Sequence, residues 1–335
     1  DGLTYRPDAF NTALTWEKTT TYNAGLDLGF ANDRFTASID YYYRKTTDLI
    51  NTVTVAAGSN FRNKVTSNVG ELHNQGLEFS LTYRPIVTKD WRWEIGYNLT
   101  YNDNKIDKLV ASDDPNYKIL HGGLAVGDSG SDGIQAWAVG HPVSAYYTYQ
   151  QVYDQNGLPI EGEFVDRNGD GIINSNDRYF YKKADADVLM GFTSKLIYKN
   201  WDFSFSLRAS LGNYAYNAVE ASNSNVEVER LYNGSSWHNV PTMVLEKKWN
   251  YVSTEDGLSD YFIQNASFLK CDNITVGYSF EKLFSLPISG RIYATAQNVF
   301  TITKYKGIDP EINGGYDGNI YPRPFTGVLG LNLNF

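Results

Sequence analysis

The sequence predicts an all-β protein: a transmembrane antiparallel β-barrel with long extracellular loops and short periplasmic turns. Three observations support this prediction: segments that alternate with a period of two, a high aromatic content, and connections that are short at one end and long at the other. The 335 residues include 26 Tyr, 17 Phe and 7 Trp, which make up 15% of the chain. Outer-membrane barrels carry aromatic girdles at both membrane interfaces, and these girdles account for such a content.

The first four predicted strands alternate between an apolar and a polar face, because successive side chains of a strand point to opposite sides of a sheet. Leu, Ile, Phe, Tyr and Trp occupy one face, and Asn, Asp, Ser, Thr, Glu and Arg occupy most of the other. Tight turns at Ala31–Asp33 and Val87–Asp90 join them in pairs. The four segments are Tyr22–Phe30, Phe35–Arg44, Leu77–Arg84 and Trp91–Asn102.

Six further strands follow. The fifth is rich in tyrosine and alternates less regularly, and the sixth and seventh form a hairpin through Lys199-Asn200. In the last strand Leu329, Leu331, Leu333 and Phe335 share one face. The six segments are Ser144–Tyr153, Asp187–Tyr198, Trp201–Leu211, Ile274–Phe280, Arg291–Phe300 and Leu329–Phe335.

The polar faces contain Asp, Glu and Arg in mid-strand. A packed sandwich core does not accept such charges unpaired, whereas a wet lumen does. Segments of about ten residues cross a bilayer when they are tilted. Between them lie five connections that are long for a compact domain and are predicted to be extracellular. These connections are Ile50–Leu72, Lys105–Pro142, Tyr153–Ala186, Gly212–Tyr261 and Thr303–Pro324.

Composition excludes several other classes. No stretch of about 18 apolar residues could cross a membrane as a helix, and the mean hydropathy is −0.41. The net charge of −9 argues against binding of nucleic acid, because no basic stripe is present to neutralise phosphates. The single cysteine, Cys271, excludes a disulfide within the chain and is predicted to lie in a strand as a small hydrophobic residue.

Several phrases of the sequence resemble the SusC/RagA-type TonB-linked (TonB-dependent) outer-membrane transporters, and their order matches that family over nearly the whole chain. Lys270 stands where the family usually has Arg. The phrases are Trp16–Thr20 with Gly25–Asp27, Asp40–Leu49, Asn68–Gly70 with Asn74–Glu78, Ser267–Lys270 with Gly277-Tyr278, Asp309–Glu311, and Tyr321–Pro324.

This resemblance implies a barrel of about 22 strands in the outer membrane of a Gram-negative bacterium, filled by an N-terminal plug domain. It also implies a SusD-like surface lipoprotein as a lid and the TonB complex as the source of energy. Residues 1–335 are then expected to be the C-terminal part of the barrel, with the plug domain and the TonB box not present in this chain. Ten strands are too few to surround a plug, so we expect either a portion of a longer transporter or a barrel built from two polypeptides.

Residues Asp166–Asp177 fit an EF-hand-type calcium loop, with Gly171 at the sharp turn and Asp177 in place of the usual final Glu. The predicted Ca²⁺ would stiffen an extracellular loop; the alternative is a Gly/Asn/Asp-rich turn without metal. No nucleotide or organic cofactor is expected. The candidate ligands are Asp166, Asn168, Asp170, the Ile172 carbonyl, Asn174 and Asp177.

The sequence does not indicate an enzyme, because no nucleophile elbow is present and the four histidines lack metal-ligand spacing. Aromatic residues in the long loops are candidates to stack on substrate; packing within the loops is the alternative for each of them. These candidates are Trp137, Tyr149, Tyr232 and Trp237.

The predicted function is that of an outer-membrane nutrient importer, which takes up oligosaccharides or peptides in a TonB-dependent manner together with the SusD-like lipoprotein. Its further contacts would be the remaining barrel and plug, the outer-membrane lipid and the substrate. Two alternatives stay open: a small passive β-barrel pore, and a surface glycan-binding β protein.

Overall fold

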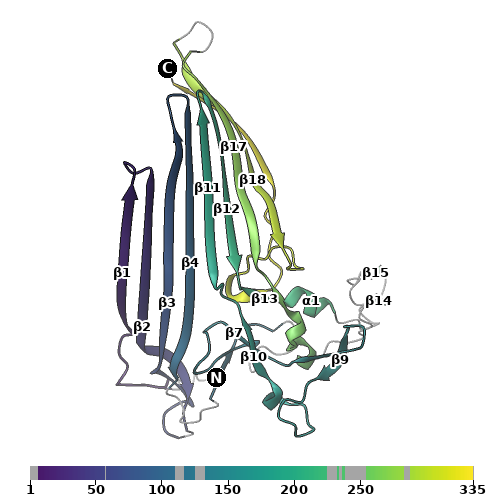
Figure 1. Cartoon of the computed structure of the whole chain (residues 1–335). Helices are drawn as coiled ribbons and strands as arrows, with labels where there is room; N and C mark the ends of the chain where they lie inside the picture. The colour runs from purple at the N-terminus through teal and green to yellow at the C-terminus, as the bar shows by residue number, and fades with distance from the viewer. Residues whose placement is uncertain are drawn as a thin grey trace, which may run out of the picture.

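A computed structural model describes residues 7–56, 58–109, 117–124, 133–224, 232–233, 236–237, 254–282 and 287–334. Its main element is a nine-stranded antiparallel sheet whose long strands stand side by side (Figure 1). In spatial order the strands are β1 (Lys18–Phe30), β2 (Phe35–Thr54), β3 (Lys64–Val87), β4 (Trp91–Leu109), β11 (Val188–Tyr198), β12 (Trp201–Leu211), β17 (Phe268–Phe280), β18 (Ser289–Thr303) and β20 (Thr326–Asn334).

One face of this sheet is apolar and exposed, from Leu26 in β1 (56% exposed) to Leu329 in β20 (86% exposed). A sheet surrounded by water would bury such a face, whereas a bilayer covers it. The predicted alternation is therefore confirmed, with the apolar residues facing lipid and the polar residues facing the lumen. Cys271 lies in β17 and is buried, as predicted.

The short turns all lie at one end of the sheet. Ala31, Asn32 and Asp33 between β1 and β2 have positive φ angles of 54° to 58°, which Asn and Asp tolerate better than most residues. The Arg34 guanidinium donates to the carbonyls of Arg84 and Pro85 at 3.2 and 2.7 Å, and so ties this turn to the next one.

Two predictions about the strands were wrong. The segment Ser144–Tyr153 is not a barrel strand, because residues from Ala145 to Tyr149 are buried on both faces and belong to other sheets. The connection Ile50–Leu72 is also shorter than predicted, since β2 and β3 continue to Thr54 and from Lys64 with register shifts that absorb the irregular sequence.

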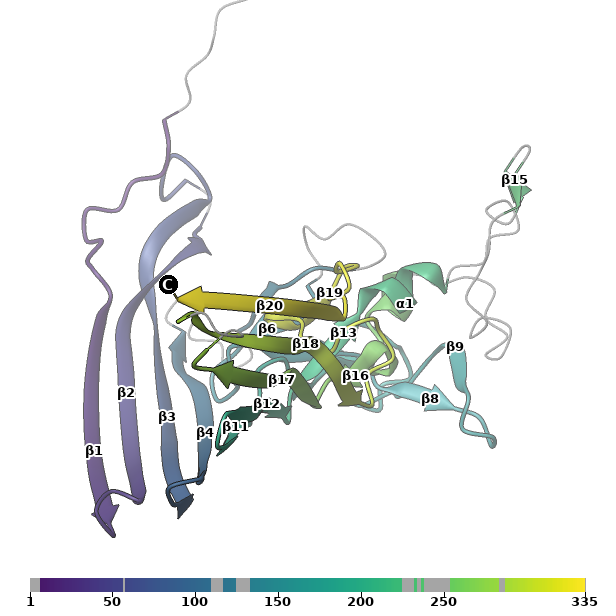
Figure 2. The same cartoon turned by 90° about the horizontal axis from the view of Figure 1, so that it is seen from above.

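The long connections at the other end fold together into a lobe (Figure 1), which Figure 2 shows on the side away from β1. Its strands form small sheets: β5 (Ile119–His121), β6 (Gln135–Trp137), β7 (Ala145–Thr148) and β10 (Tyr179–Lys183); β13 (Tyr214–Asn217), β16 (Ile263–Asn265) and β19 (Tyr316–Asp317); β8 (Gln151–Tyr153) and β9 (Pro159–Phe164). Its helices are α1 (Ala218–Asn223), α4 (Thr254–Gly257) and the 3₁₀ turns Ser175–Asp177, Asp260–Phe262 and Asn313–Gly315.

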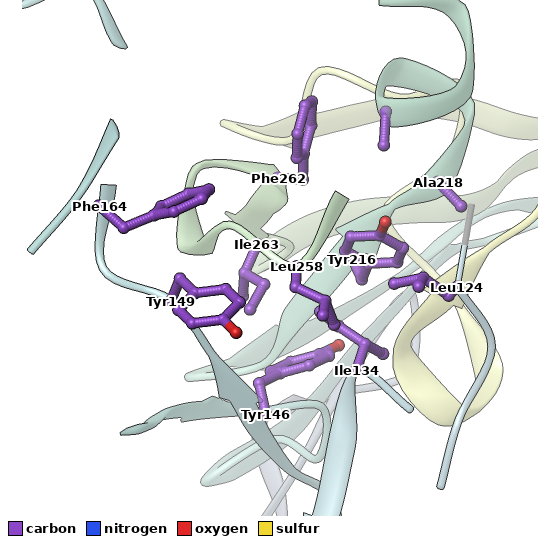
Figure 3. Packing of buried hydrophobic residues seen from close by; sticks show 11 residues of the cluster. Leu124, Ile134, Tyr146, Tyr149, Phe164, Tyr216, Ala218, Leu258, Phe262 and Ile263 are labelled. Carbon is purple, nitrogen blue, oxygen red and sulfur yellow. The ribbon is translucent and has the colours of Figure 1, made fainter. Parts of the chain in front are cut away.

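The lobe has a hydrophobic core of its own, built from segments far apart in the sequence (Figure 3). Tyr146, Tyr216 and Phe262 are fully buried in it. The Tyr146 hydroxyl donates to the carbonyls of Tyr214 and Gly315, so the core joins the middle of the chain to its last loop. Burial of whole aromatic side chains makes this a folded unit rather than a set of independent loops.

Two short strands, β14 (Tyr232–Asn233) and β15 (Ser236–Trp237), pair with each other. The side chains of Tyr232 and Trp237, and all of Phe335, lie outside the described residues. Among the described helices, none combines the length and the apolar character needed to cross a bilayer.

Candidate functional site

The lumen face of the sheet is polar, and its side chains bond across neighbouring strands. The hydroxyls of Ser38 and Ser80 lie 2.7 Å apart, and Arg291 forms two hydrogen bonds with Asp202 at 2.9 and 2.6 Å. Charges that would be costly in a dry core are thus paired on a wet wall. This face is suited to contact hydrated or hydrogen-bonding molecules.

A cavity of about 650 Å³ lies where this wall meets the final loop, residues 304–325. We call it the lumenal pocket. Most of its polar lining is uncharged and consists of amides and hydroxyls. These groups belong to Tyr42, Asn98, Thr100, Asn102, Ser210, Asn213 and Asn313.

The wall contributes two aromatic side chains to the lumenal pocket, Phe268 of β17 and Tyr42 of β2. Tyr42 also brings a hydroxyl. Its hydroxyl donates to Asn102 at 2.6 Å, and its ring lies against the backbone at Gly76. A Cβ atom at Gly76 would lie 2.5 Å from the Tyr42 hydroxyl and 2.4 Å from the Tyr101 carbonyl. Glycine is therefore required for the ring to lie flat on the wall.

Arg208 of β12 fixes the final loop to the wall. It donates to both oxygens of Glu311 at 2.5 and 2.8 Å and to both oxygens of Asp272 at 2.9 and 2.8 Å. Charge-assisted hydrogen bonds with this fork geometry are strong and directional. The loop is consequently held at the lumen rather than free above it.

Lys270 of β17 forms the second anchor of the final loop. Its ammonium group lies 2.6 Å from Asp309 and 3.1 Å from Glu311, and the side chains of Lys270 and Asp309 are 7% and 8% exposed. Arg323 also pairs with Asp309 and Glu311. Together with Arg208 and Asp272 these residues form a network of three cations and three carboxylates, whose formal charges cancel.

The network keeps Glu311 ionised. Burial disfavours its charged form, but the hydrogen bonds from Arg208 and Lys270 outweigh burial and lower its pKa to about 2. At neutral pH the wall of the lumenal pocket therefore carries a charge on Glu311 that is paired with cations, while Asp185, which also lines the pocket, accepts a hydrogen bond from Ser144.

The far side of the final loop is attached to the lobe. Tyr216 and Asn217 of β13 pair in parallel with Tyr316 and Asp317 of β19. The Tyr305 hydroxyl donates to the Asp317 carboxylate at 2.5 Å within the loop. The final loop thus connects the barrel wall and the lobe and closes one side of the lumenal pocket.

Of the predicted substrate aromatics, Trp137 and Tyr149 do not line this pocket, and the side chains of Tyr232 and Trp237 lie outside the described residues. Trp137 donates to the Val143 carbonyl at 3.0 Å and packs against His121, and Tyr149 is buried in the lobe core against Phe164. Sequence reasoning missed Tyr42, although the alternation of β2 places it as an aromatic residue on the polar face. An aromatic residue on the polar face of a strand is the sequence feature that could have identified it.

The predicted calcium loop forms a compact turn around two carboxylates. Asp166 accepts from the backbone N–H groups of Gly169 and Gly171, and Asp177 accepts from those of Arg167 and Asn174. Hydrogen bonds lower the pKa of Asp177, and the bond from the Asn174 backbone N–H has the largest effect. Of the other candidate ligands, Asn168 and Asp170 bond to each other at 2.9 Å, and Asn174 donates to the Ile172 carbonyl at 3.3 Å.

Among the described residues, no three His, Cys, Asp or Glu side chains converge closely enough to hold a metal ion. The three aspartates of the loop are thus not drawn around one point in this conformation. Calcium binding at the loop remains a prediction.

Comparison with known proteins gives the family. A family model described as "TonB dependent receptor-like, beta-barrel" matches residues 2–127. The TonB-dependent receptor SusC of Bacteroides thetaiotaomicron is 51% identical over 336 residues, which cover 99% of this chain and 33% of that protein. The TonB-dependent receptor P3 of Formosa agariphila is 29% identical over 365 residues, covering 98% and 35%.

Solved structures agree on the fold. The RagAB peptide importer in its "open-open" state superimposes with a TM-score of 0.74 at 25% identity, covering 97% of this chain and 35% of that one. A second RagAB structure, of the peptide transporter, gives 0.74 at 24% identity. The chain spans about a third of the length of the relatives it matches. It is a barrel portion of a SusC/RagA-type TonB-dependent receptor of the outer membrane.

Proposed function

We propose that the chain forms part of the wall of a nutrient importer that takes up oligosaccharides or peptides across the outer membrane with energy from TonB. The observation that carries this proposal is the lumenal pocket, which is bounded by the wall and a fixed final loop and whose polar lining is mostly uncharged. Cargo would form hydrogen bonds with amide groups such as Asn98 and Asn102 and would contact the ring of Tyr42. Sites that bind through a few placed polar groups select by hydrogen-bond geometry.

The partners belong to the same proposal. The RagAB structures are those of a peptide importer, and resemblance to this family supports a SusD-like lipoprotein as the lid of this transporter. A plug domain and the rest of the barrel would complete the lumen, and the TonB complex would act through the plug. The exposed apolar face would contact outer-membrane lipid.

Uptake by intact cells tests the function and sorts the cargo. A strain lacking the full-length gene is complemented with the wild-type gene and given labelled neutral oligosaccharides and peptides of matched size. We expect one class to accumulate only in the complemented strain, and its uptake to require the neighbouring lipoprotein gene. If both classes accumulated in the deletion strain to the same level as in the complemented strain, the proposal would be contradicted.

A structural Ca²⁺ in the loop Asp166–Asp177 is a further part of the proposal. The sequence supplies oxygen ligands at the spacing of a calcium loop, and two carboxylates, Asp166 and Asp177, accept from backbone N–H groups of the same turn. Two neighbouring carboxylates favour a cation between them. When bound, the ion would hold this loop in a fixed position on the lobe.

A further inference from the structure

A second cavity, of about 410 Å³, lies at the rim of the barrel and is distinct from the lumenal pocket. We call it the rim pocket. It combines aromatic rings with cations, a composition that no part of the transport proposal uses. The lining residues that matter here are His141, Phe180, Tyr181, Lys182, Lys183 and Tyr214.

The rim pocket faces away from the lumen. Tyr146 points inward, because its hydroxyl donates to Gly315 of the final loop at 2.8 Å. Its neighbours Ala145 and Tyr147 therefore point outward. Phe180 pairs with Tyr147 in the sheet, and the His141 ring stacks on Phe180 at 3.7 Å, so both belong to the outward side.

The pocket also lies at the edge of the lipid-facing belt, which is the exposed apolar face of the nine-stranded sheet. Asp187 and Gly212, which line it, are one residue beyond Val188 and Leu211, the last outward apolar pair of β11 and β12. At the same height along β4, the outward-facing residues change from aromatic to charged: Tyr101 is 46% exposed, and Lys105, further along the strand, is also exposed. This is the level at which the hydrocarbon layer gives way to headgroups.

Lys182 gives the lining of the pocket its excess positive charge, and Lys105 adds a second cation beside the lining. The Lys182 ammonium lies 5.2 Å from the centre of the Tyr214 ring and 5.4 Å from that of Tyr181. Lys105 is outside the lining, and its Cε atom would lie 3.9 Å from a Cβ atom added at Gly140, next to His141. Among the residues that the structure describes, neither lysine has a carboxylate partner, whereas Lys183 pairs with Asp187 at 2.8 Å. A phosphate group in the pocket would be attracted by both lysines, and acyl chains would continue over the belt below.

We propose that the rim pocket binds the phosphorylated headgroup of an anionic glycolipid of the outer leaflet. Charge complementarity and continuity with the apolar belt support a lipid over a free ion. The lipid would fix the lobe relative to the membrane surface. This role is independent of the cargo and of the energy source.

The test titrates fluorescent lipid A into phosphatidylcholine nanodiscs that hold the full-length transporter. A basic residue near a charged membrane surface contributes about fivefold in affinity, so the double variant Lys182→Ala, Lys105→Ala is expected to bind about 25-fold more weakly. Lys182→Arg keeps the charge and is expected to retain binding. Lys199→Ala is the matched control, because Lys199 lies over Tyr198 at 5.4 Å at the periplasmic end.

Two further arms separate the lipid from other anions. Dephosphorylated lipid A is expected to bind the wild type as weakly as lipid A binds the double variant, and inorganic phosphate is expected not to compete. Equal affinity of the double variant and the Lys199→Ala control, with both variants folded as judged by their melting temperatures, would overturn the proposal. Full displacement by inorganic phosphate would also overturn it and assign the pocket to a free anion.

Discussion

Arg208 and Glu311, 103 residues apart in the sequence, meet through two hydrogen bonds of 2.5 and 2.8 Å. This pair holds the final loop against the wall of the barrel. Because the same loop pairs with β13 of the lobe, this contact and the anchor at Lys270 together fix one side of the lumenal pocket.

Removal of the Lys270 ammonium should loosen the final loop. Lys270→Ala leaves Asp309, which is only 8% exposed, without its closest cation, and breaking a buried pair in this way costs about 3–5 kcal/mol. We expect faster amide hydrogen exchange around Asp309–Ile312 in the full-length transporter. Lys89→Ala in a periplasmic turn is the control, and equal protection of the loop in both variants would contradict the anchor.

The attachment of the final loop should depend on pH through Glu311. Its pKa in the folded protein, about 2, lies below the ordinary 4.5, so its contribution to stability is present above about pH 4.5 and is lost as the pH falls toward 2. Exchange of the loop amides, corrected for intrinsic rates, measures this loss. Glu311→Gln should weaken the loop at neutral pH and flatten the dependence; an unchanged profile would refute the assignment.

The Gly76 position should not accept a side chain. In Gly76→Ala the new methyl group would lie 2.4 Å from the Tyr101 carbonyl and 2.5 Å from the Tyr42 hydroxyl. We expect a loss of about 1–3 kcal/mol in the free energy of unfolding, measured by urea titration in detergent. Gly327→Ala in β20 is the control, since nothing lies within 4 Å of its added Cβ.

Calcium should stabilise the lobe through the loop Asp166–Asp177. We expect the ion to raise the melting temperature of the wild type, and a chelator to reverse the rise. Asp177→Ala should abolish this response, because both oxygens of Asp177 organise the loop. Asp154→Ala, in the turn between β8 and β9, should keep the response. Loss of the calcium-dependent rise in melting temperature in both variants would place the ion elsewhere.

The strands of the barrel wall were predictable from the sequence because the alternation of apolar and polar residues can be read within each strand alone. Alternation along β1 or β12 depends only on which face meets lipid, so each strand reports its own orientation. The turn Ala31–Asp33 is local in the same sense. The segment Ser144–Tyr153 does not follow this rule, since its residues are packed on both sides and some of their partners are more than a hundred positions away, as in the contact of Thr148 with Leu258.

The functional site was less predictable for the same physical reason. The Asp309–Glu311 phrase was visible in the sequence, but its cations, Arg208 and Lys270, lie on strands whose register only the fold provides. Tyr42 carried a local signal as an aromatic residue on a polar face. Of the loop aromatics that the sequence suggests as substrate contacts, Tyr149 lies in the core of the lobe.

The most direct test of the account is uptake of the identified cargo by cells that carry the full-length transporter, with and without TonB. We expect uptake to require TonB and to fall at least about fivefold, the equivalent of about 1 kcal/mol for one lost hydrogen bond, in the double variant Tyr42→Ala, Asn102→Ala at an equal amount of protein in the membrane. Uptake at the wild-type rate without TonB, or in the double variant, would contradict the claim that the lumenal pocket lies on the path of an energised importer.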